Sequence, residues 1–486
     1  MSRSVRTIVI VGSGIQGLMT ALALRGDNAR ITVHSAGRDP RTPGDARAST
    51  TNGEAGRFIT PLEGHPYLGD GPMYPDMAGA FTRRATEGGW LGDDVPSYSE
   101  SEQAWLRARH AANHDAAGLA VTADWFAQTS LDAMDRWREL FDSHASLFVG
   151  TSLIRDAGVL CLYDQPHLVN LAADAHHRLG TLQATLDAAA LADEAPELAT
   201  ACRTGTIAGG LRVTGYSLDV KRLTLNLINA LEATGVRFVW SNECTAVNRD
   251  GQNRVASLQF TRGRVTADDY VLHPGAYAGA ALSAAFGLKI SGVAGRWLLL
   301  PRPLGLPCPV KVHFSPRETR QGTHAVMDLN LTPYIDPQRD REYLAIGGGY
   351  LHVGDYPFRY DDVERRHLDD EIATAVRRLL PDWFARCEAD GSVVRSDATC
   401  VRALTPDDRP AVICEPTAHG GHLLLHAGLN TGVTAMAPAI AHHIACLLRT
   451  GEAKHAEALR PPKVESHNKI AVCPVRRTQC LASGTQ

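Results

Sequence analysis

The chain has 486 residues, of which 44% are hydrophobic and 21% charged, and its formal net charge is −4. This length allows two domains with substantial cores, and the near-neutral balance argues against nucleic acid or an anionic membrane as a partner. No uninterrupted apolar stretch approaches the roughly 20 residues of a membrane span, and the N-terminus lacks a signal-peptide pattern. The ten cysteines are scattered without CxxC pairs, as in proteins with free cytosolic thiols. We therefore expect a cytoplasmic protein without a transmembrane segment.

The first forty residues predict a βαβ unit. A β-branched strand (TIVIV) leads into GSGIQG, an apolar helix and a second strand (ARITVH). In a dinucleotide-binding unit, the first glycine of G-x-G-x-x-G permits a tight turn and the second lets a pyrophosphate approach the backbone. The third lets helix and strand pack closely, and the helix N-terminus supplies N–H donors. The predicted dinucleotide contacts are Gly12, Gly14, Ile15, Gln16 and Gly17.

The end of the second strand leaves the identity of the dinucleotide open. Ser35 stands where such units usually carry Asp or Glu for the adenosine ribose, and Arg38 and Arg41 follow it. A small polar residue with nearby arginines suits the 2′-phosphate of NADP. Ser35 can also accept one hydrogen bond from an unphosphorylated ribose, so FAD stays open.

The rest of the chain alternates between helical and strand-like patterns. The segment 218–279 has the order helix, strand, strand, hairpin, strand and glycine turn, which recurs where a dinucleotide domain is interrupted by another domain. The remaining expectations are a loop over 48–75, helix over 100–142, a strand and helix over 156–179, strands over 290–350, helix over 369–384, a strand, turn and helix over 419–448, and a polar tail over 461–486.

Several segments resemble those of a known family. Residues 47–58 (RASTTNGEAGRF) resemble its S-x-x-N-x-G segment, 400–410 (CVRALTPDDRP) its Thr-Pro-Asp segment, and 426–441 (HAGLNTGVTAMAPAIA) its last flavin-contacting turn and helix. As far as Leu459, the chain resembles the FAD-dependent amine and amino-acid oxidoreductases, which include D-amino-acid dehydrogenase, glycine oxidase and monomeric sarcosine oxidase. The resemblance implies an α/β fold with a discontinuous Rossmann-like FAD-binding domain and an α+β substrate domain with a mixed or antiparallel sheet. The implied FAD-binding segments are 1–60, 206–285 and 395–460, the substrate-domain segments are 61–205 and 286–394, and 461–486 is a flexible tail.

The resemblance also implies FAD, extended across the first domain with its ring against the second. Backbone N–H groups at the start of the last helix would stabilise negative charge on the reduced flavin. No metal site is expected, because the adjacent histidine pairs 176–177 and 442–443 face different directions on their helices. Besides the glycine loop and Ser35, the implied cofactor contacts are Ser49, Thr50, Asn52, Val247, Gly275, Cys400, Gly428, Asn430, Thr431, Gly432, Val433 and Thr434.

Two residues of the segment 400–410 match different branches of the family. Cys400 falls where sarcosine-oxidase-like members attach FAD through a thioether, and Arg402 falls on an arginine that holds the substrate carboxylate in dehydrogenase-like members. A small buried strand residue is the alternative for Cys400, and a structural ion pair is the alternative for Arg402. Non-covalent and covalent FAD therefore both stay open.

Four residues are candidates for the substrate side of the site: Arg402, Arg57, His65 and Tyr350. Arg57 follows the NGEAG loop and could reach an anionic group, but it could also be a surface arginine. His65 and Tyr67 could line an entrance or simply pack within their loop. Arg296 is a further candidate for shaping the pocket.

The predicted function is oxidation of the C–N bond of a small amine or amino acid by hydride transfer to flavin, which gives an imine. O2 or an electron carrier would reoxidise the flavin. Two alternatives stay open: an NADP-dependent oxidoreductase, and a non-catalytic flavoprotein that serves as an assembly or modifying partner. The turn Gly428-Leu429-Asn430, in place of the more usual Gly-His-Gly, motivates the second alternative.

Overall fold

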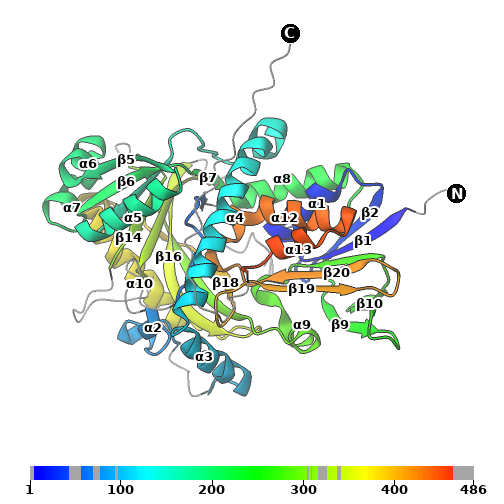
Figure 1. Cartoon of the computed structure of the whole chain (residues 1–486). Helices are drawn as coiled ribbons and strands as arrows, with labels where there is room; N and C mark the ends of the chain where they lie inside the picture. Colours follow the sequence, from blue (N-terminus) through cyan, green and yellow to red (C-terminus); the bar gives the residue numbers. More distant parts are fainter. Residues whose placement is uncertain are drawn as a thin grey trace, which may run out of the picture.

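The computed structural model describes residues 5–42, 56–68, 77–92, 97–303, 306–307, 309–315, 326–336 and 341–462. The chain forms two lobes, and the long helix α4 (Ala116–Ser143) runs between them (Figure 1). One lobe carries the first strands and the last long helix, and the other carries most of the middle of the chain. Residues far apart in the sequence therefore meet where the lobes face each other.

A six-stranded sheet forms the centre of the first lobe. Its order is β19-β20-β12-β1-β2-β8, and all neighbours are parallel except the antiparallel pair β19–β20. The strands come from the beginning, the middle and the end of the chain, so the lobe is discontinuous in sequence. They are β1 (Arg6–Val11), β2 (Ala29–His34), β8 (Arg237–Val239), β12 (Asp269–Leu272), β19 (Ala411–Pro416) and β20 (His422–Ala427).

Both faces of this sheet are covered, which explains why β1 is apolar at successive positions. Ile8 and Ile10 pack in one core with the helices, whereas Val9 and Val11 pack in a second core with the small sheet and α9, as the alternation of side chains along a strand requires. The helices are α1 (Ile15–Leu24), α8 (Val220–Ala233), α12 (Val433–Thr450) and α13 (Ala453–Ala458), and the other face carries β9 (Cys244–Arg249), β10 (Val255–Phe260), β11 (Gly263–Val265) and α9 (Gly279–Phe286).

Helix α12 is both long and apolar. The segment Asn430–Thr450 is long and apolar enough to cross a membrane by length and composition, and 72% of its most apolar window is buried inside the protein. Core helices pass the same test. Trp137 of α4 donates its indole N–H to the carbonyl of Ala435 at 3.0 Å, which fixes α4 against the start of α12.

The second lobe is built on a nine-stranded, mostly antiparallel sheet. Its order is β17-β13-β16-β15-β14-β4-β6-β5, and β18 also pairs with β13. The domain boundary predicted at residue 395 lies inside β17, and the strand that carries Cys400 and Arg402 belongs to this sheet. The strands are β4 (Val159–Tyr163), β5 (Leu182–Asp187), β6 (Gly209–Val213), β13 (Ser291–Pro301), β14 (Val310–His313), β15 (Asp328–Asp336), β16 (Arg341–Gly354), β17 (Val394–Arg395) and β18 (Cys400–Leu404).

Helices cover one face of this sheet, and part of the other face looks toward the first lobe. Val310 and Val312 pack into the helix-covered core, so Lys311 and His313 of the same strand point to the opposite face. The helices of this lobe are α5 (Pro166–Arg178), α6 (Ala188–Glu194), α7 (Ala199–Arg203), α10 (Asp362–Leu379) and α11 (Pro381–Ala389), and α2 (Met77–Ala80) and α3 (Glu100–Ala112) lie at its edge (Figure 1).

The expected helices and strands are present wherever the structure describes them, but the helix expected over 100–142 is two helices, α3 and α4, separated by residues 113–115. Residues 56–59 form strand β3 (Gly56–Ile59) inside the predicted loop, because they pair antiparallel with β7 (Tyr216–Asp219). That partner is about 160 residues away, and no local pattern announces it. Ser49, Thr50, Asn52 and most of the predicted tail lie outside the described residues.

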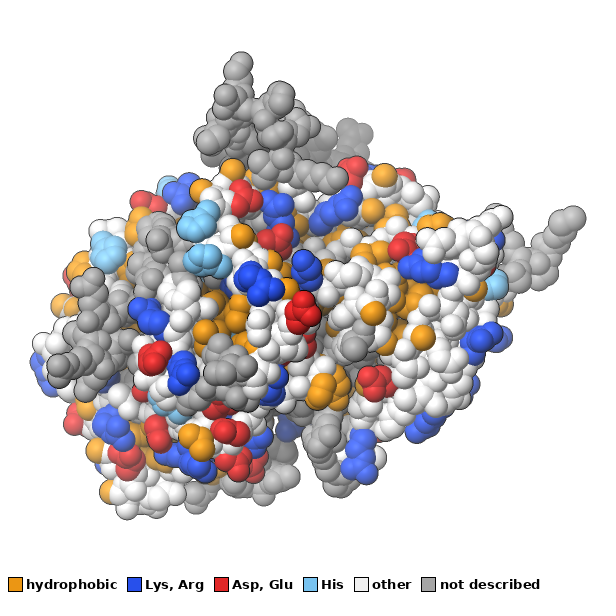
Figure 2. All heavy atoms as spheres, turned by 90° about the horizontal axis from the view of Figure 1, so that it is seen from below, with side chains coloured by type: hydrophobic (Ala, Val, Ile, Leu, Met, Phe, Trp, Pro, Cys, Tyr) orange, Lys and Arg blue, Asp and Glu red, His pale blue; other side chains and the backbone are white. Residues whose placement is uncertain are grey.

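The surface agrees with the small net charge. On the face seen in Figure 2, basic and acidic side chains alternate over the lobes. This face has no broad basic field of the kind that binds nucleic acid.

Candidate active site

One large cavity lies between the lobes. Its empty volume is about 1940 Å³, with open solvent at its mouth included, and both lobes contribute to its walls. The first lobe supplies the glycine loop, Ser35 and residues 273–278, and the second supplies strands β13 to β16 and β18. The cavity thus joins the predicted nucleotide-binding end to the predicted substrate end.

The glycine loop forms one wall, with Gly12, Gly14, Ile15, Gln16 and Gly17 all lining the cavity. Gly12 has φ +106°, and a Cβ there would lie 2.3 Å from the carbonyl oxygen of His273. A Cβ on Gly17 would lie 1.9 Å from the carbonyl oxygen of Gly12. A larger residue at Gly12 would collide with the backbone that follows β12, and one at Gly17 would collide with the turn itself, so both positions require glycine.

The arginines that favour NADP do not reach this cavity. Ser35 lines it and accepts a hydrogen bond from the hydroxyl of Ser13 at 2.9 Å. Arg41 instead forms ion pairs with Asp39 and Glu232, and Arg38 is exposed and outside the lining. The described residues therefore offer no guanidinium for a 2′-phosphate at this end.

The turn before α12 forms a second wall. Gly428 and Asn430 both have positive φ, +78° and +43°. The Asn430 side chain accepts from the Gly432 N–H at 3.1 Å and donates to the carbonyl of His65 at 2.9 Å. The predicted contacts Gly428, Asn430, Thr431, Val433 and Thr434 line the cavity, and so does Gly275.

Two predicted cofactor contacts do not line the cavity. Gly432 does not line the cavity; a Cβ there would lie 2.7 Å from the Cα of Gly64, so this glycine serves the packing of the turn on the 60–67 loop. Val247, on β9, packs against a hydrophobic core of the first lobe. Glu243 and Cys244, at the start of that strand, line the cavity instead.

Strand β18 brings Cys400 and Arg402 to the cavity. The Arg402 guanidinium lies 4.5 Å from the ring centroid of Tyr350 and donates to the carbonyls of Ala294 and Gly349 at 3.3 and 3.0 Å. Within the described residues, no carboxylate pairs with it. Arg402 thus keeps its charge available to a ligand.

Of the other candidates, two face the cavity and two do not. Arg57 of β3 lines the cavity with its guanidinium 5.0 Å from the Trp297 ring centroid, and Tyr350 also lines it. His65 lies behind Tyr67, with ring centroids 4.3 Å apart, and burial lowers the pKa of His65 to about 3 with help from the charge of Lys311. Arg296 is held by both oxygens of Asp369 at 2.9 Å, so it is a structural ion-pair residue.

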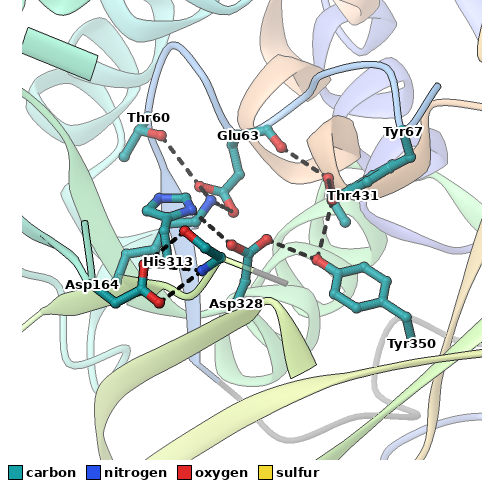
Figure 3. A network of polar contacts seen from close by, with 10 residues as sticks. Thr60, Glu63, Tyr67, Asp164, His313, Asp328, Tyr350 and Thr431 are labelled. Carbon is teal, nitrogen blue, oxygen red and sulfur yellow. Dashed lines mark hydrogen bonds and ion pairs between the residues drawn. The ribbon is translucent and has the colours of Figure 1, made fainter. Parts of the chain in front are cut away.

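Sequence reasoning missed a row of buried charges on the substrate side (Figure 3). Lys311 donates to both carboxylate oxygens of Glu63 at 3.2 Å. Asp328 lies 2.7 Å from Nδ1 of His313 and accepts from the Tyr350 hydroxyl at 3.0 Å. Glu63, Lys311 and Asp328 all line the cavity.

These groups stabilise one another's charge. Burial alone would raise the pKa of Asp328, but His313 and Lys311 outweigh it and hold that pKa well below the ordinary value. Burial alone would lower the pKa of Lys311, but Glu63 and Asp328 raise it. The wall therefore presents an ionised carboxylate and a protonated amine.

Two tyrosines complete this wall as neutral donors. Burial raises the pKa of Tyr67 to about 12 and that of Tyr350 well above its ordinary value. The Tyr67 hydroxyl lies 2.9 Å from that of Thr431, which donates to the carbonyl of Glu63 at 2.8 Å. The 60–67 loop is thereby tied to the turn before α12.

One feature of the sequence could have located these buried charges. The chain has six lysines, and Lys311 is the centre of the strand-like run PVKVHF, where its neighbours alternate with core positions. A lysine at such a position is unusual unless it is paired or functional.

The comparisons with known proteins agree with this geometry. The family described as "DAO: FAD dependent oxidoreductase" matches residues 7–447. The chain therefore belongs to this family, and it is an FAD-dependent oxidoreductase. No curated protein matches the sequence.

Solved structures share the fold at low sequence identity. Glycine oxidase from Bacillus cereus superposes with a TM-score of 0.60 at 13% identity, over 94% of this chain and 99% of that one. L-proline dehydrogenase from P. horikoshii superposes with a TM-score of 0.56 at 15% identity, over 92% of this chain and 94% of that one. Iminodiacetate oxidase from Chelativorans sp. BNC1 superposes with a TM-score of 0.57 at 15% identity, over 92% of this chain and 95% of that one.

The residues present fit FAD. The glycine loop leaves no room for side chains where a pyrophosphate approaches, and the same cavity continues past Gly428 to the charged wall. The turn 428–434 would lie at the flavin ring, with the N-terminus of α12 toward it.

Proposed function

We propose that this oxidoreductase acts on the C–N bond of an amino acid or a related amine that carries a carboxylate. One observation carries the proposal: Tyr350 has a cation on one side and a carboxylate on the other. Arg402 lies 4.5 Å from its ring centroid, and Asp328 accepts from its hydroxyl at 3.0 Å. A carboxylate and an amino group on one small molecule complement this pair of charges.

FAD, when bound, supplies the acceptor for the hydride that leaves the carbon next to nitrogen. The protein's own groups bind and orient the substrate. Arg402 takes the carboxylate, and Asp328 accepts a hydrogen bond from the amino group, since a carboxylate has about four acceptor sites. Loss of hydride from carbon and of a proton from nitrogen leaves a C=N bond, which water hydrolyses.

The neighbours' names support this substrate class. The three structures reported above are named for glycine, L-proline and iminodiacetate, and each of these molecules carries both a nitrogen and a carboxylate. Arg57 over Trp297 offers a second cation in the same cavity, which suits a substrate with a further anionic group.

The test compares flavin reduction without oxygen by amino acids, by amines without a carboxylate, and by 2-hydroxy acids. We expect the amino acids to reduce the flavin and the hydroxy acids to leave it oxidised. Arg402→Lys should raise the Kd of an amino acid at least about 10-fold, because lysine lacks the planar fork, and should change that of a plain amine little. The proposal fails if no amine reduces the flavin, or if the variant binds amino acids as tightly as the unmodified protein.

Covalent attachment through Cys400 is a separate proposal. Its thiol is free, partly exposed and lines the cavity. After acid precipitation, a thioether would keep the yellow colour in the pellet, and Cys400→Ser would release it. Colour in the supernatant of the unmodified protein would show that FAD is held by non-covalent contacts alone.

A further inference from the structure

The end of β2 carries a serine where a dinucleotide-binding fold usually has a carboxylate. Ser35 occupies the position at the end of β2 where an acid binds the adenosine ribose in most such folds. Its hydroxyl already takes part in a hydrogen bond with Ser13. Ser35 would therefore be a weak partner for the ribose hydroxyls of FAD.

A different strand brings a carboxylate to the same end. Glu243 lines the cavity just before β9 begins. The preceding residue, Asn242, donates its backbone N–H to the carbonyl of Ser35 at 2.8 Å, and Ser241 does the same to Gly37. The segment of Glu243 is therefore hydrogen-bonded directly to the end of β2.

Asn242 holds this segment in place. Its side chain is buried, donates toward His34 at 2.8 Å and accepts from the N–H of Arg262 at 3.0 Å and the hydroxyl of Thr261 at 3.2 Å. Although Glu243 itself is exposed, its backbone has little freedom. The position of its carboxylate is limited to what one side chain can reach.

The Glu243 side chain lines the cavity near residues 273–278. The Glu243 carboxylate lies 3.7 Å from where a Cβ on Gly279 would be, on the side of the 273–278 wall. The other carboxylates that line the cavity, Glu63 and Asp328, belong to the charged wall described above. Among the lining residues, Glu243 thus supplies the carboxylate of the nucleotide end.

We propose that Glu243 accepts hydrogen bonds from the adenosine ribose hydroxyls of FAD, in place of the acid missing at residue 35. A carboxylate at this position also repels a 2′-phosphate, so it selects an unphosphorylated adenosine. The proposal rests on the cofactor and is independent of which substrate is oxidised.

The test measures the Kd of FAD by flavin fluorescence on flavin-free full-length protein, in a Cys400→Ser background so that no thioether can form. Glu243→Gln keeps the shape and removes the charge. Its matched control is Glu139→Gln, an exposed glutamate on α4 outside the cavity. Each protein is titrated with FAD and with an FAD analogue whose adenosine ribose lacks both hydroxyls.

We expect Glu243→Gln to raise the Kd of FAD roughly 10- to 100-fold, the range of a hydrogen bond to a charged group, and Glu139→Gln to leave it unchanged. With the analogue, the difference between Glu243→Gln and its parent should shrink to less than about 3-fold. An unchanged Kd for FAD, or an equal loss for FAD and the analogue, would overturn the assignment. Both results can be read whether or not any amine reduces the flavin.

Discussion

Lys311 is a charged residue in the interior, and its effect on stability follows from its neighbours. Its side chain is 6% exposed, and that of Glu63 is 9% exposed. Removing one partner of a buried pair leaves the other charge without compensation. We therefore expect Lys311→Met to lower the free energy of unfolding by about 3–5 kcal/mol, measured by urea denaturation at neutral pH.

The double variant Lys311→Met/Glu63→Gln provides the control. If the cost comes from the uncompensated Glu63 charge, the double variant should recover a substantial part of the stability. Additive losses would show that Lys311 stabilises the fold through its alkyl packing instead.

The roles of some single residues can be predicted from the sequence, and those of others cannot. The roles of Gly12 and Gly17 follow from G-x-G-x-x-G, because the backbone contacts that require glycine are local to the turn. The short segment 400–410 is enough to predict that Arg402 belongs to the site. Lys311 and Asp328 were not found, since their meaning depends on which strands become neighbours in the second sheet.

The turn 428–434 packs against the 60–67 loop. Gly432 approaches Gly64 so closely that a Cβ would lie 2.7 Å from its Cα. Gly432→Ala should push the loop away and cost about 1–3 kcal/mol, the usual range for overpacking. It should also weaken FAD binding, because Tyr67 and Thr431 are linked across this contact.

The matched control is Gly26→Ala. A Cβ at Gly26 would have nothing within 4 Å, and its φ is not in the left-handed range. The replacement should change the melting temperature little or raise it slightly. If both variants have the same melting temperature, the close approach of Gly432 to Gly64 does not make Gly432→Ala destabilising.

Elements with strong local patterns were predictable, and those made by distant pairing were not. The helix α12 and strands β1 and β2 follow from periodicity and β-branched residues. Strand β3 exists because residues 56–59 pair with β7, and β18 joins the second sheet through β13. The domain boundary predicted at residue 395 was placed without knowledge of the pairing between β18 and β13, because no local pattern in the sequence indicates it.

For the whole molecule, buried histidines set the response to acid. Burial lowers the pKa of His65, His273 and His352 to about 3 and that of His426 to about 4. In the unfolded chain these histidines take up protons near pH 6.5, whereas in the folded chain they stay neutral at that pH. Stability is therefore full above pH 6.5 and is lost as the pH falls from there toward the folded-state values.

Each of these histidines can cost up to about 1.4 kcal/mol per pH unit in that window. Asp219 acts in the opposite direction, because burial raises its pKa to about 6. Three further histidines act in the same direction as the four above, because burial lowers the pKa of His34, His176 and His443 to about 4. We expect a clear drop in melting temperature between pH 7 and pH 5.5. His352→Gln should make the drop smaller, and a melting temperature that rises on acidification would contradict this account.

We expect FAD to bind in the cavity between the lobes and to accept electrons there from an amino acid or a related nitrogen-bearing acid. The most direct measurement is the visible spectrum of the purified protein under argon, before and after addition of a mixture of amino acids. The expected result is an oxidised flavin band that disappears when the amino acids are added and returns when an electron acceptor is admitted. A colourless protein that takes up no added FAD, or a flavin band that no amino acid bleaches, would contradict it.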